Sequence, residues 1–271
     1  MGQTIACANQ KGGVGKTTTV VNLASALTLL GDRVLVIDLD PQGNATSGLG
    51  IDRRTLTGSV YDAVVGDTDL VDLVLRVPGS SIDVVPASIA LAGAEIELAA
   101  IDARERRVRR IAAGIAERYD VVFIDCPPSL GLLTVNALTA ADAVLIPLQC
   151  EYYALEGLTQ LLATIDLVRD HLHPGLALNG VVLTMFDART NLSADVATEA
   201  RTHLGDLVYR TVIPRSVRLS EAPSHGLPIS SYAPVSRGAD AYRALAEEFR
   251  DRLGMPAPAG VDTTPVAEAV A

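Results

Sequence analysis

Cysteine is scarce in this sequence, and the pattern of what is missing excludes several classes of protein. The three cysteines, Cys7, Cys126 and Cys150, are widely spaced and each lies in or beside an apolar run. Their spacing fits neither a disulfide framework nor a zinc site, so we expect reduced, buried thiols. The first residues lack the basic and apolar regions of a signal peptide. No uninterrupted apolar stretch approaches the ~20 residues that span a bilayer. These absences predict a soluble, cytoplasmic protein.

Positive charge is also in short supply. The formal net charge is −10, which argues against a chain coated with positive charge for nucleic acid but leaves room for a local basic patch. Lysine occurs only twice, as Lys11 and Lys16, and every other cation is arginine. Both lysines lie in one glycine-rich loop, where a compact ammonium fits between phosphates better than a planar guanidinium. Two residues are too few to exclude chance, so this pattern indicates a phosphate site only together with the surrounding motif.

The chain can bury a full core, since 49% of its 271 residues are hydrophobic. Short β-branched runs alternate with helical patterns, and the runs are almost continuously apolar, as in strands buried on both faces of a parallel sheet. Strands are predicted at 4–8, 34–38, 82–85, 121–125, 143–147, 178–184 and 207–212. Helices are predicted at 17–30, 89–99, 103–118, 132–140, 153–171, 193–204 and 239–253.

This order of elements predicts a doubly wound α/β fold of the P-loop type. A mostly parallel sheet would carry helices on both faces, joined by right-handed crossovers. We assign residues 1–254 to one such domain. From Met255 the composition changes to Pro, Ala, Gly, Val and Thr without periodicity, so residues 255–271 are predicted to form a disordered tail.

A phosphate-binding loop follows the first predicted strand and opens the first predicted helix, which is the context that such a motif requires. Its glycines let successive backbone N–H groups converge on phosphate oxygens, and the helix N-terminus adds about half a unit of positive charge. Lys16 is expected to reach the β and γ phosphates, Thr17 to bind Mg²⁺ and Thr18 to contact the α-phosphate. The predicted nucleotide-binding residues of the loop are Lys11, Gly12, Gly13, Val14, Gly15, Lys16, Thr17 and Thr18. The sequence therefore predicts a Mg²⁺-dependent P-loop ATPase.

The start of the loop departs from the ordinary motif, which has glycine where this sequence has Gln10. Lys-Gly-Gly-Val-Gly-Lys-Thr-Thr resembles the deviant Walker A loop of the ParA/MinD family of ATPases. The resemblance implies that Lys11 crosses a dimer interface and touches the phosphates bound by a second chain. A lysine there neutralises charge that develops in phosphoryl transfer, as an arginine finger does. Lys11 would then join Lys16 as a catalytic residue of a homodimer that holds ATP between its chains.

Aspartates end two of the predicted strands, and open α/β sheets bind ligands at such strand ends. Asp38 and Asp40 lie two residues apart and face the same side, where either could orient water toward the γ-phosphate or hold a magnesium-bound water. The chemistry does not rank the two, and capping of the turn before Pro41 is a further explanation. The resemblance assigns catalysis to Asp40, with Asp38 in support. Asp125 follows four apolar residues, as in a Walker B motif, and is expected to hold the magnesium through water.

Two further pairs of residues are implied by the resemblance. It places Met185 and Pro214 on either side of the adenine, whereas the residues alone indicate two ordinary loop positions. It also matches Arg189 and Arg218 to positions at which family members contact DNA, and phosphate contacts of this kind need no base reading. A denser arginine run at 104–110 is spread around its predicted helix and is more typical of a solvated face.

The resemblance extends over about residues 3–253, and the segments 39–50 and 218–226 match the chromosome-partitioning branch of the family. It implies a nucleoid-associated ATPase whose ATP-bound dimer binds double-stranded DNA without sequence preference, and whose hydrolysis a ParB-type partner stimulates. A MinD-like, membrane-associated ATPase is an alternative. That alternative requires a basic amphipathic end, but no Lys or Arg follows Arg252, so we expect no membrane partner. A metabolic enzyme on the same fold is a further alternative.

Overall fold

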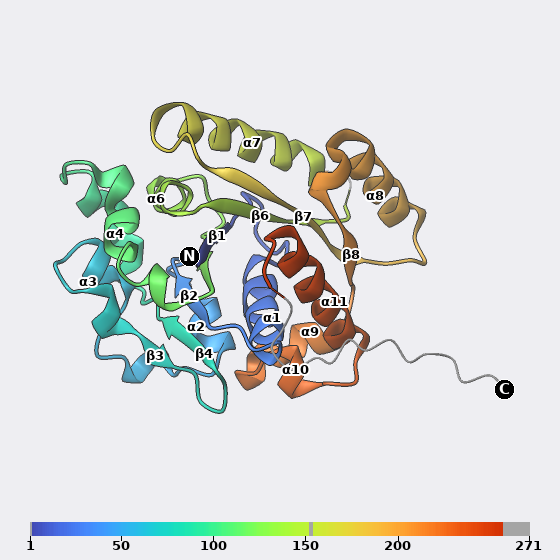
Figure 1. The fold of residues 1–271 in the computed structure, drawn as a ribbon, viewed down its shortest axis with the longest axis horizontal. Helices are drawn as coiled ribbons and strands as arrows, with labels where there is room; N and C mark the ends of the chain where they lie inside the picture. Colours follow the sequence, from blue (N-terminus) through green and yellow to red (C-terminus); the bar gives the residue numbers. More distant parts are fainter. Residues whose placement is uncertain (1, 152–153, 257–271) are drawn as a thin grey trace.

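The computed structural model describes residues 2–151 and 154–256, which form an eight-stranded sheet with helices on both sides (Figure 1). The strand order is β3-β4-β2-β5-β1-β6-β7-β8, and every neighbouring pair is parallel except β3 with β4. The strands are β1 Gln3–Cys7, β2 Val34–Asp38, β3 Leu75–Arg76, β4 Ile82–Val85, β5 Val121–Asp125, β6 Ala143–Gln149, β7 Ala177–Phe186 and β8 Val208–Pro214. The predicted doubly wound α/β fold is confirmed; among the described strands only the two-residue β3 was not predicted.

Helices cover the sheet on both faces. The α-helices are α1 Lys16–Leu29, α2 Asn44–Gly48, α3 Val60–Val64, α4 Leu91–Leu98, α5 Arg107–Ala112, α6 Leu132–Ala140, α7 Ala154–His171, α8 Asn191–Leu204, α9 Val217–Glu221, α10 Ile229–Tyr232 and α11 Arg237–Arg252. Single 3₁₀ turns are η1 Arg53–Thr55, η2 Leu70–Leu73, η3 Arg104–Arg106, η4 Ala116–Arg118, η5 Gly205–Leu207 and η6 Ala222–His225. In Figure 1, α6, α7 and α8 lie on one side of the sheet, and α1 and α11 lie on the other.

The central strands are buried on both faces because their side chains alternate between two apolar cores. In β1, Ala6 belongs to the core that includes α3 to α8, whereas Ile5 belongs to the core that includes α1, α2 and α9 to α11. In β5, Ile124 and Phe123 divide in the same way. This double burial explains why the strands appear in the sequence as continuous apolar runs.

One predicted helix is wrong. The helix predicted at 103–118 is divided into η3, α5 and η4. The cause is Asn136 of α6, whose side chain donates to the carbonyl oxygen of Arg104 (2.8 Å) and accepts from the backbone N–H of Val108 (3.1 Å). Those two backbone groups would bond to each other in an α-helix. The inserted amide replaces that bond, and Gly114 further on weakens helical propensity.

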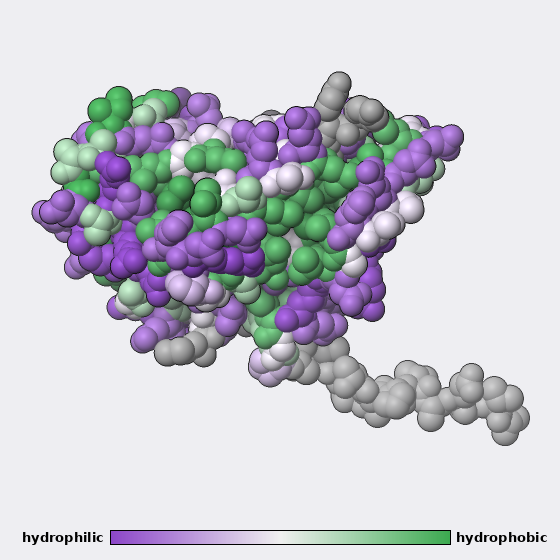
Figure 2. Space-filling model, turned by 90° about the horizontal axis from the view of Figure 1, so that it is seen from above, coloured by the Kyte–Doolittle hydropathy of each residue, from purple (hydrophilic) through white to green (hydrophobic). Residues whose placement is uncertain are grey.

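Several predictions concern residues near the limits of the described chain. Residue 153, the predicted start of the helix that forms α7, lies outside the described residues, as does most of the predicted tail, 257–271. Within the described ranges, no helix combines the length and apolarity needed to cross a membrane. The face seen from above, on the side of α7, carries an apolar area among polar side chains (Figure 2).

A candidate nucleotide-binding site

The glycine-rich loop connects β1 to α1, at the carboxyl edge of the parallel sheet. Gly13 and Gly15 have φ angles of +77° and +91°. Residues with a Cβ atom adopt this backbone conformation only with strain. Among the described residues, no side chain caps the N-terminus of α1, and its first turn contains no acidic residue. The uncapped N–H groups and the helix dipole therefore leave a site for an anion at this end of α1.

Two side chains from outside the loop fix its position. Thr184 of β7 donates a hydrogen bond from its hydroxyl to the carbonyl oxygen of Val14 at 2.7 Å. Asn9 is buried; its amide donates to the carbonyl oxygen of Pro147 in β6 at 2.8 Å and accepts from the backbone N–H of Lys11 at 3.0 Å. The loop is therefore held on the sheet by its neighbours before any ligand binds.

The two lysines of the loop have different surroundings. Lys16 is buried, lines the cavity above the loop, and donates from Nζ to the carbonyl oxygen of Lys11 at 3.3 Å. Lys11 is not among the residues that line this cavity. Its ammonium instead forms an ion pair of 2.9 Å with Glu151, just beyond β6, and both side chains are more than one-third exposed. Lys11 thus lies outside the cavity that Lys16 lines.

Thr17 and Asp125 meet at the predicted magnesium position. The Thr17 hydroxyl donates to Oδ2 of Asp125 at 2.7 Å. Oδ1 of Asp125 is buried and has no hydrogen-bond partner among the described residues. Burial, followed by the nearby Asp38 carboxyl, raises the pKa of Asp125 well above its ordinary value. Hard oxygen donors and a buried carboxyl oxygen without a partner fit Mg²⁺, which is usually bound by one or two protein ligands together with phosphates and water.

The structure separates the two aspartates at the end of β2. Asp38 is fully buried and accepts from both the backbone N–H (2.8 Å) and the hydroxyl (2.6 Å) of Thr46, so it holds α2 against the sheet. Asp40 lines the cavity and accepts from the backbone N–H of Gln42 at 2.9 Å. Asp38 therefore supports the segment that carries Asp40, and Asp40 is the carboxylate of the two that lines the cavity.

Removal of the Thr46 hydroxyl should destabilise the fold, and more so at high pH. Burial raises the pKa of Asp38 to about 6, above the ~3.9 of an unfolded aspartate. Stability falls as pH rises between these values, because the unfolded chain releases its proton first. Without the hydroxyl the folded pKa rises further. We expect Thr46→Val to lower the free energy of unfolding by about 1–3 kcal/mol, with a greater loss near pH 8 than near pH 5 in urea denaturation.

The control for this variant is Thr198→Val. The Thr198 hydroxyl is on the exposed surface of α8, where it donates to the carbonyl oxygen of Ala194. Its removal should change stability by less than about 0.5 kcal/mol at either pH. Equal losses in the two variants would contradict the role given to Thr46.

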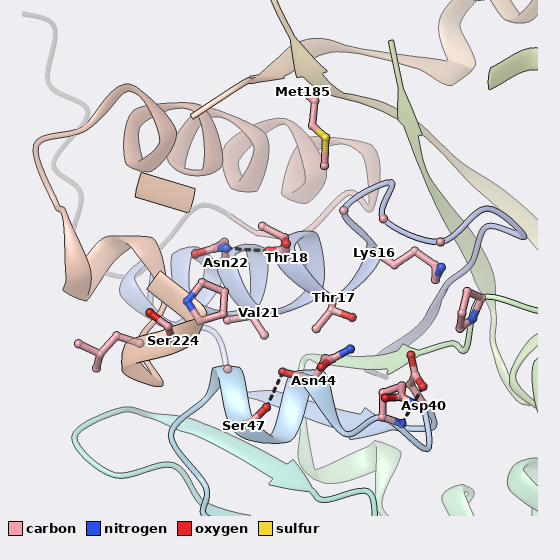
Figure 3. Close-up of a pocket in the computed structure, with 18 residues that line it drawn as sticks. Lys16, Thr17, Thr18, Val21, Asn22, Asp40, Asn44, Ser47, Met185 and Ser224 are labelled. Carbon is pink, nitrogen blue, oxygen red and sulfur yellow. Dashed lines mark hydrogen bonds between the residues drawn. The ribbon is translucent and has the colours of Figure 1, made fainter. Parts of the chain in front are cut away.

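A cavity of about 530 Å³ extends from the loop along α1 (Figure 3). A second cavity of about 280 Å³ adjoins it, and both are lined by Gly15, Thr18 and Met185. Pro214 lines the second cavity, so the predicted adenine pair, Met185 and Pro214, borders one hollow. Met185 has a φ of +52°, which is uncommon for a residue with a side chain and is typical of strain kept at functional sites. In Figure 3 the Met185 side chain reaches toward Thr18.

Other residues of the cavity were not predicted as site residues. They come from α1, from α2 and its preceding turn, and from the turn η6. They include Val21, Asn22, Gln42, Asn44, Ser47, Gly48, Pro223, Ser224 and Leu227. Most of these from outside α1 belong to the segments 39–50 and 218–226 that carry the family resemblance, so a signal was present. The sequence does not show that two segments so far apart form facing walls.

The predicted DNA-binding arginines each follow a residue that lines the second cavity, but neither lines it. Arg189 follows Met185 by four residues, and Arg218 follows Pro214 by four residues. Arg189 pairs with Asp187 at 2.7 Å, and its hydrogen bond holds the pKa of that carboxyl well below the usual range. Arg218 pairs with Glu221 at 3.0 Å. Both arginine side chains are more than 60% exposed, and exposed pairs of this kind contribute only about 0–1 kcal/mol.

These parts define a class of protein. A mostly parallel sheet presents a glycine loop, an uncapped helix N-terminus and the carboxyl of Asp40 to one cavity, and the strand-end carboxyl of Asp125 accepts from Thr17, which lines it, as in P-loop ATPases. A family model described as an AAA domain matches residues 2–178.

Known proteins identify the branch. The sporulation initiation inhibitor protein Soj of Bacillus subtilis is 58% identical over 92% of this chain and 98% of its own length. The chromosome partitioning protein ParA of Myxococcus xanthus is 51% identical over 93% of this chain and 89% of its own. A solved structure named cobyrinic acid a,c-diamide synthase, from Mycobacterium smegmatis with an ATP analogue and magnesium, is 42% identical; its TM-score is 0.82, over 91% of this chain and 93% of that one. The chain belongs to the Soj/ParA family of chromosome-partitioning ATPases, which confirms both the predicted family and the predicted ATPase class.

Proposed function

We propose that the chain is a DNA-segregation ATPase that works as a homodimer with ATP and Mg²⁺ between its two chains. The observation that carries this proposal is the position of Lys11. Lys16 lines the cavity of its own chain, whereas Lys11 lies outside it and is paired with exposed Glu151. An ammonium placed in this way can leave a weak surface pair and contact phosphates held by a second chain.

The residues around the cavity divide the work of hydrolysis. Lys16 and the N–H groups at the start of α1 would bind and orient the phosphates, with Thr18 at the α-phosphate. Thr17 and Asp125 would hold Mg²⁺, which when bound neutralises negative charge on the phosphates. Asp40 would orient the attacking water, since its carboxylate faces the cavity. Met185 and Pro214 would border the adenine.

DNA binding is the second part of the proposal. Arg189 and Arg218 are exposed and each follows, by four residues, a residue that lines the proposed adenine cavity, so two chains would present four such arginines. Contacts with phosphates provide affinity without reading the base sequence. A dimer that forms only with ATP would therefore bind the nucleoid only with ATP. A ParB-type partner would stimulate hydrolysis and end that binding.

Binding to random-sequence duplex DNA tests this proposal. We expect binding with ATP, none with ADP or without nucleotide, and a steep loss of affinity between low and moderate salt. Light scattering in the same solutions should report a dimer with ATP. If the protein hydrolyses ATP but binds no DNA in any nucleotide state, the ATPase class stands and the DNA-segregation function is rejected.

Charge reversal at the two arginines should weaken DNA binding. Replacement by glutamate removes one phosphate contact per chain and adds repulsion, so we expect Arg218→Glu and Arg189→Glu each to lower affinity by roughly tenfold or more and to reduce the salt dependence. Arg243→Glu is the matched control, because Arg243 on α11 forms a similar exposed pair with Asp240. Dimerisation with ATP should survive in all three variants. If Arg218→Glu and Arg243→Glu bind DNA with equal affinity, the DNA surface lies elsewhere on the protein.

A metabolic enzyme is the second candidate, and the name of the Mycobacterium smegmatis structure favours it. The larger cavity also extends from Asp40 to Ser47 and Ser224, which leaves room for a substrate beside the proposed phosphate position. However, Ser47 and Ser224 already donate to carbonyl oxygens of their own segments. A carboxylate substrate such as cobyrinic acid would need to increase ATP turnover in the absence of DNA. Stimulation by DNA and a ParB-type protein, with none by that substrate, would reject this candidate.

A further inference from the structure

Two segments that are far apart in the sequence form facing walls of the larger cavity. The first follows Asp40 and contains α2, and the second follows α9, which carries Arg218, and contains η6. Ser47 of α2 and Ser224 of η6 both line the cavity, and Figure 3 shows them close to the same stretch of α1. One wall is therefore continuous with the proposed catalytic carboxylate, and the other with the proposed DNA surface.

The two walls touch through a pair of glycines. Gly50 and Gly226 have φ angles of +83° and +64°, so both occupy the left-handed region. A Cβ atom on Gly50 would lie 2.9 Å from the carbonyl oxygen of Gly226, and one on Gly226 would lie 2.8 Å from Cα of Gly50. Real Cβ atoms do not approach other heavy atoms so closely. The backbones are therefore in direct contact, with no side chain between them.

The second wall is also fixed to α1. Asn22 accepts a hydrogen bond of 2.6 Å from the backbone N–H of Ile229, three residues after Gly226. The same side chain donates to the carbonyl oxygen of Thr18 at 2.7 Å. The segment that contains α9 and η6 is thus attached to α1 near the proposed α-phosphate contact and to α2 through the glycines.

We propose that the contact between Gly50 and Gly226 couples the nucleotide site to the surface that carries Arg218. A ligand that moves Asp40 moves the segment up to Gly50, and a backbone contact transmits that movement because no flexible side chain absorbs it. The short helix α9 and its exposed Arg218–Glu221 pair then change position with the nucleotide. This coupling rests on the proposed DNA function and makes Gly50 and Gly226 positioning residues for it.

The variant Gly226→Ala tests the coupling by forcing the two backbones apart. We expect its affinity for ATP to stay within about twofold of the natural protein, because Gly226 does not line the cavity, while its ATP-dependent affinity for DNA falls about tenfold. Gly79→Ala is the matched control. Gly79 has a similar φ of +67° but nothing within 4 Å of its Cβ position, so it reproduces the backbone strain without the collision. Natural DNA affinity is expected for this control.

Two results separate this proposal from the function on which it rests. If Arg218→Glu loses DNA binding while Gly226→Ala keeps it, the DNA surface stands and the coupling is rejected. If the natural protein binds no DNA with ATP, the DNA function fails, and hydrogen exchange then decides the coupling. We expect ATP to slow amide exchange in residues 217–226 of the natural protein. If Gly226→Ala does not fold, the same exchange measurement on the natural protein tests the coupling. Exchange that is unchanged by ATP would overturn the proposal.

Discussion

Replacement of Lys16 by alanine is expected to abolish measurable ATP binding and turnover. Lys16 is a buried cation that lines the proposed phosphate end of the cavity, and within the described part of the chain only the carbonyl oxygen of Lys11 accepts from its ammonium. Its charge is therefore available to phosphates in a site with little water, where such contacts are strong. We expect the affinity for ATP to fall by a factor of roughly 100 or more, measured by calorimetric titration with Mg²⁺ present.

Lys11→Ala provides the comparison, since the chain contains no other lysine. Lys11 does not line the cavity of its own chain, so this variant should bind ATP with nearly natural affinity. Its turnover should nevertheless fall, because the proposed contact with the phosphates of the partner chain is lost. Tight ATP binding by Lys16→Ala would reject the assignment of phosphate binding to this loop. Full turnover by Lys11→Ala would reject the shared site between two chains.

Replacement of Asp40 by alanine should separate binding from chemistry. Asp40 faces the cavity but does not belong to the loop that is proposed to bind phosphate, so ATP affinity should change by only about twofold. Loss of a group that orients the attacking water lowers turnover by roughly 10²–10⁴. The ATP-bound dimer should therefore accumulate, which size-exclusion chromatography with light scattering would detect.

Asp40→Asn distinguishes a chemical role of Asp40 from a structural one. Its side-chain oxygen can still accept the hydrogen bond that the natural carboxylate receives from the N–H of Gln42, so the turn keeps its shape. We expect turnover in this variant to be as low as in Asp40→Ala. If the asparagine variant turns over ATP at the natural rate, Asp40 shapes the turn and another group orients the water.

The parts of this site that could be predicted from sequence are those with a local physical cause. Strands buried on both faces leave continuous apolar runs, and a loop that must adopt positive φ angles requires glycine, as at Gly13 and Gly15. Asp125 was predicted because a strand end with an acid beside a phosphate loop has few other uses. All of these signals lie within a few residues of the feature that they predict.

The remaining features depend on contacts between distant residues. The different roles of Asp38 and Asp40 depend on Thr46, which the sequence does not place beside Asp38. The pair between Lys11 and Glu151 joins two strands' ends that are adjacent only in the folded sheet. The helix predicted at 103–118 was wrong because Asn136, from another helix, supplies the hydrogen bonds that would have continued it.

The inserted amide of Asn136 also determines what the dense arginine run can do. DNA binds best where the cations of a protein form one track along its phosphates. Each phosphate that is neutralised in this way releases a counterion from the DNA. The run is instead divided between η3 and α5, and its arginines differ in exposure: Arg107 is largely turned away from solvent, whereas the other four are exposed. Arg107 donates to the carbonyl oxygens of Val64 and Gly66, and Arg104 to that of Ala99. Carbonyl oxygens of the protein thus occupy the guanidiniums of Arg104 and Arg107, which the sequence alone would offer to a nucleic acid, and these two arginines tie their segment to neighbouring parts of the fold.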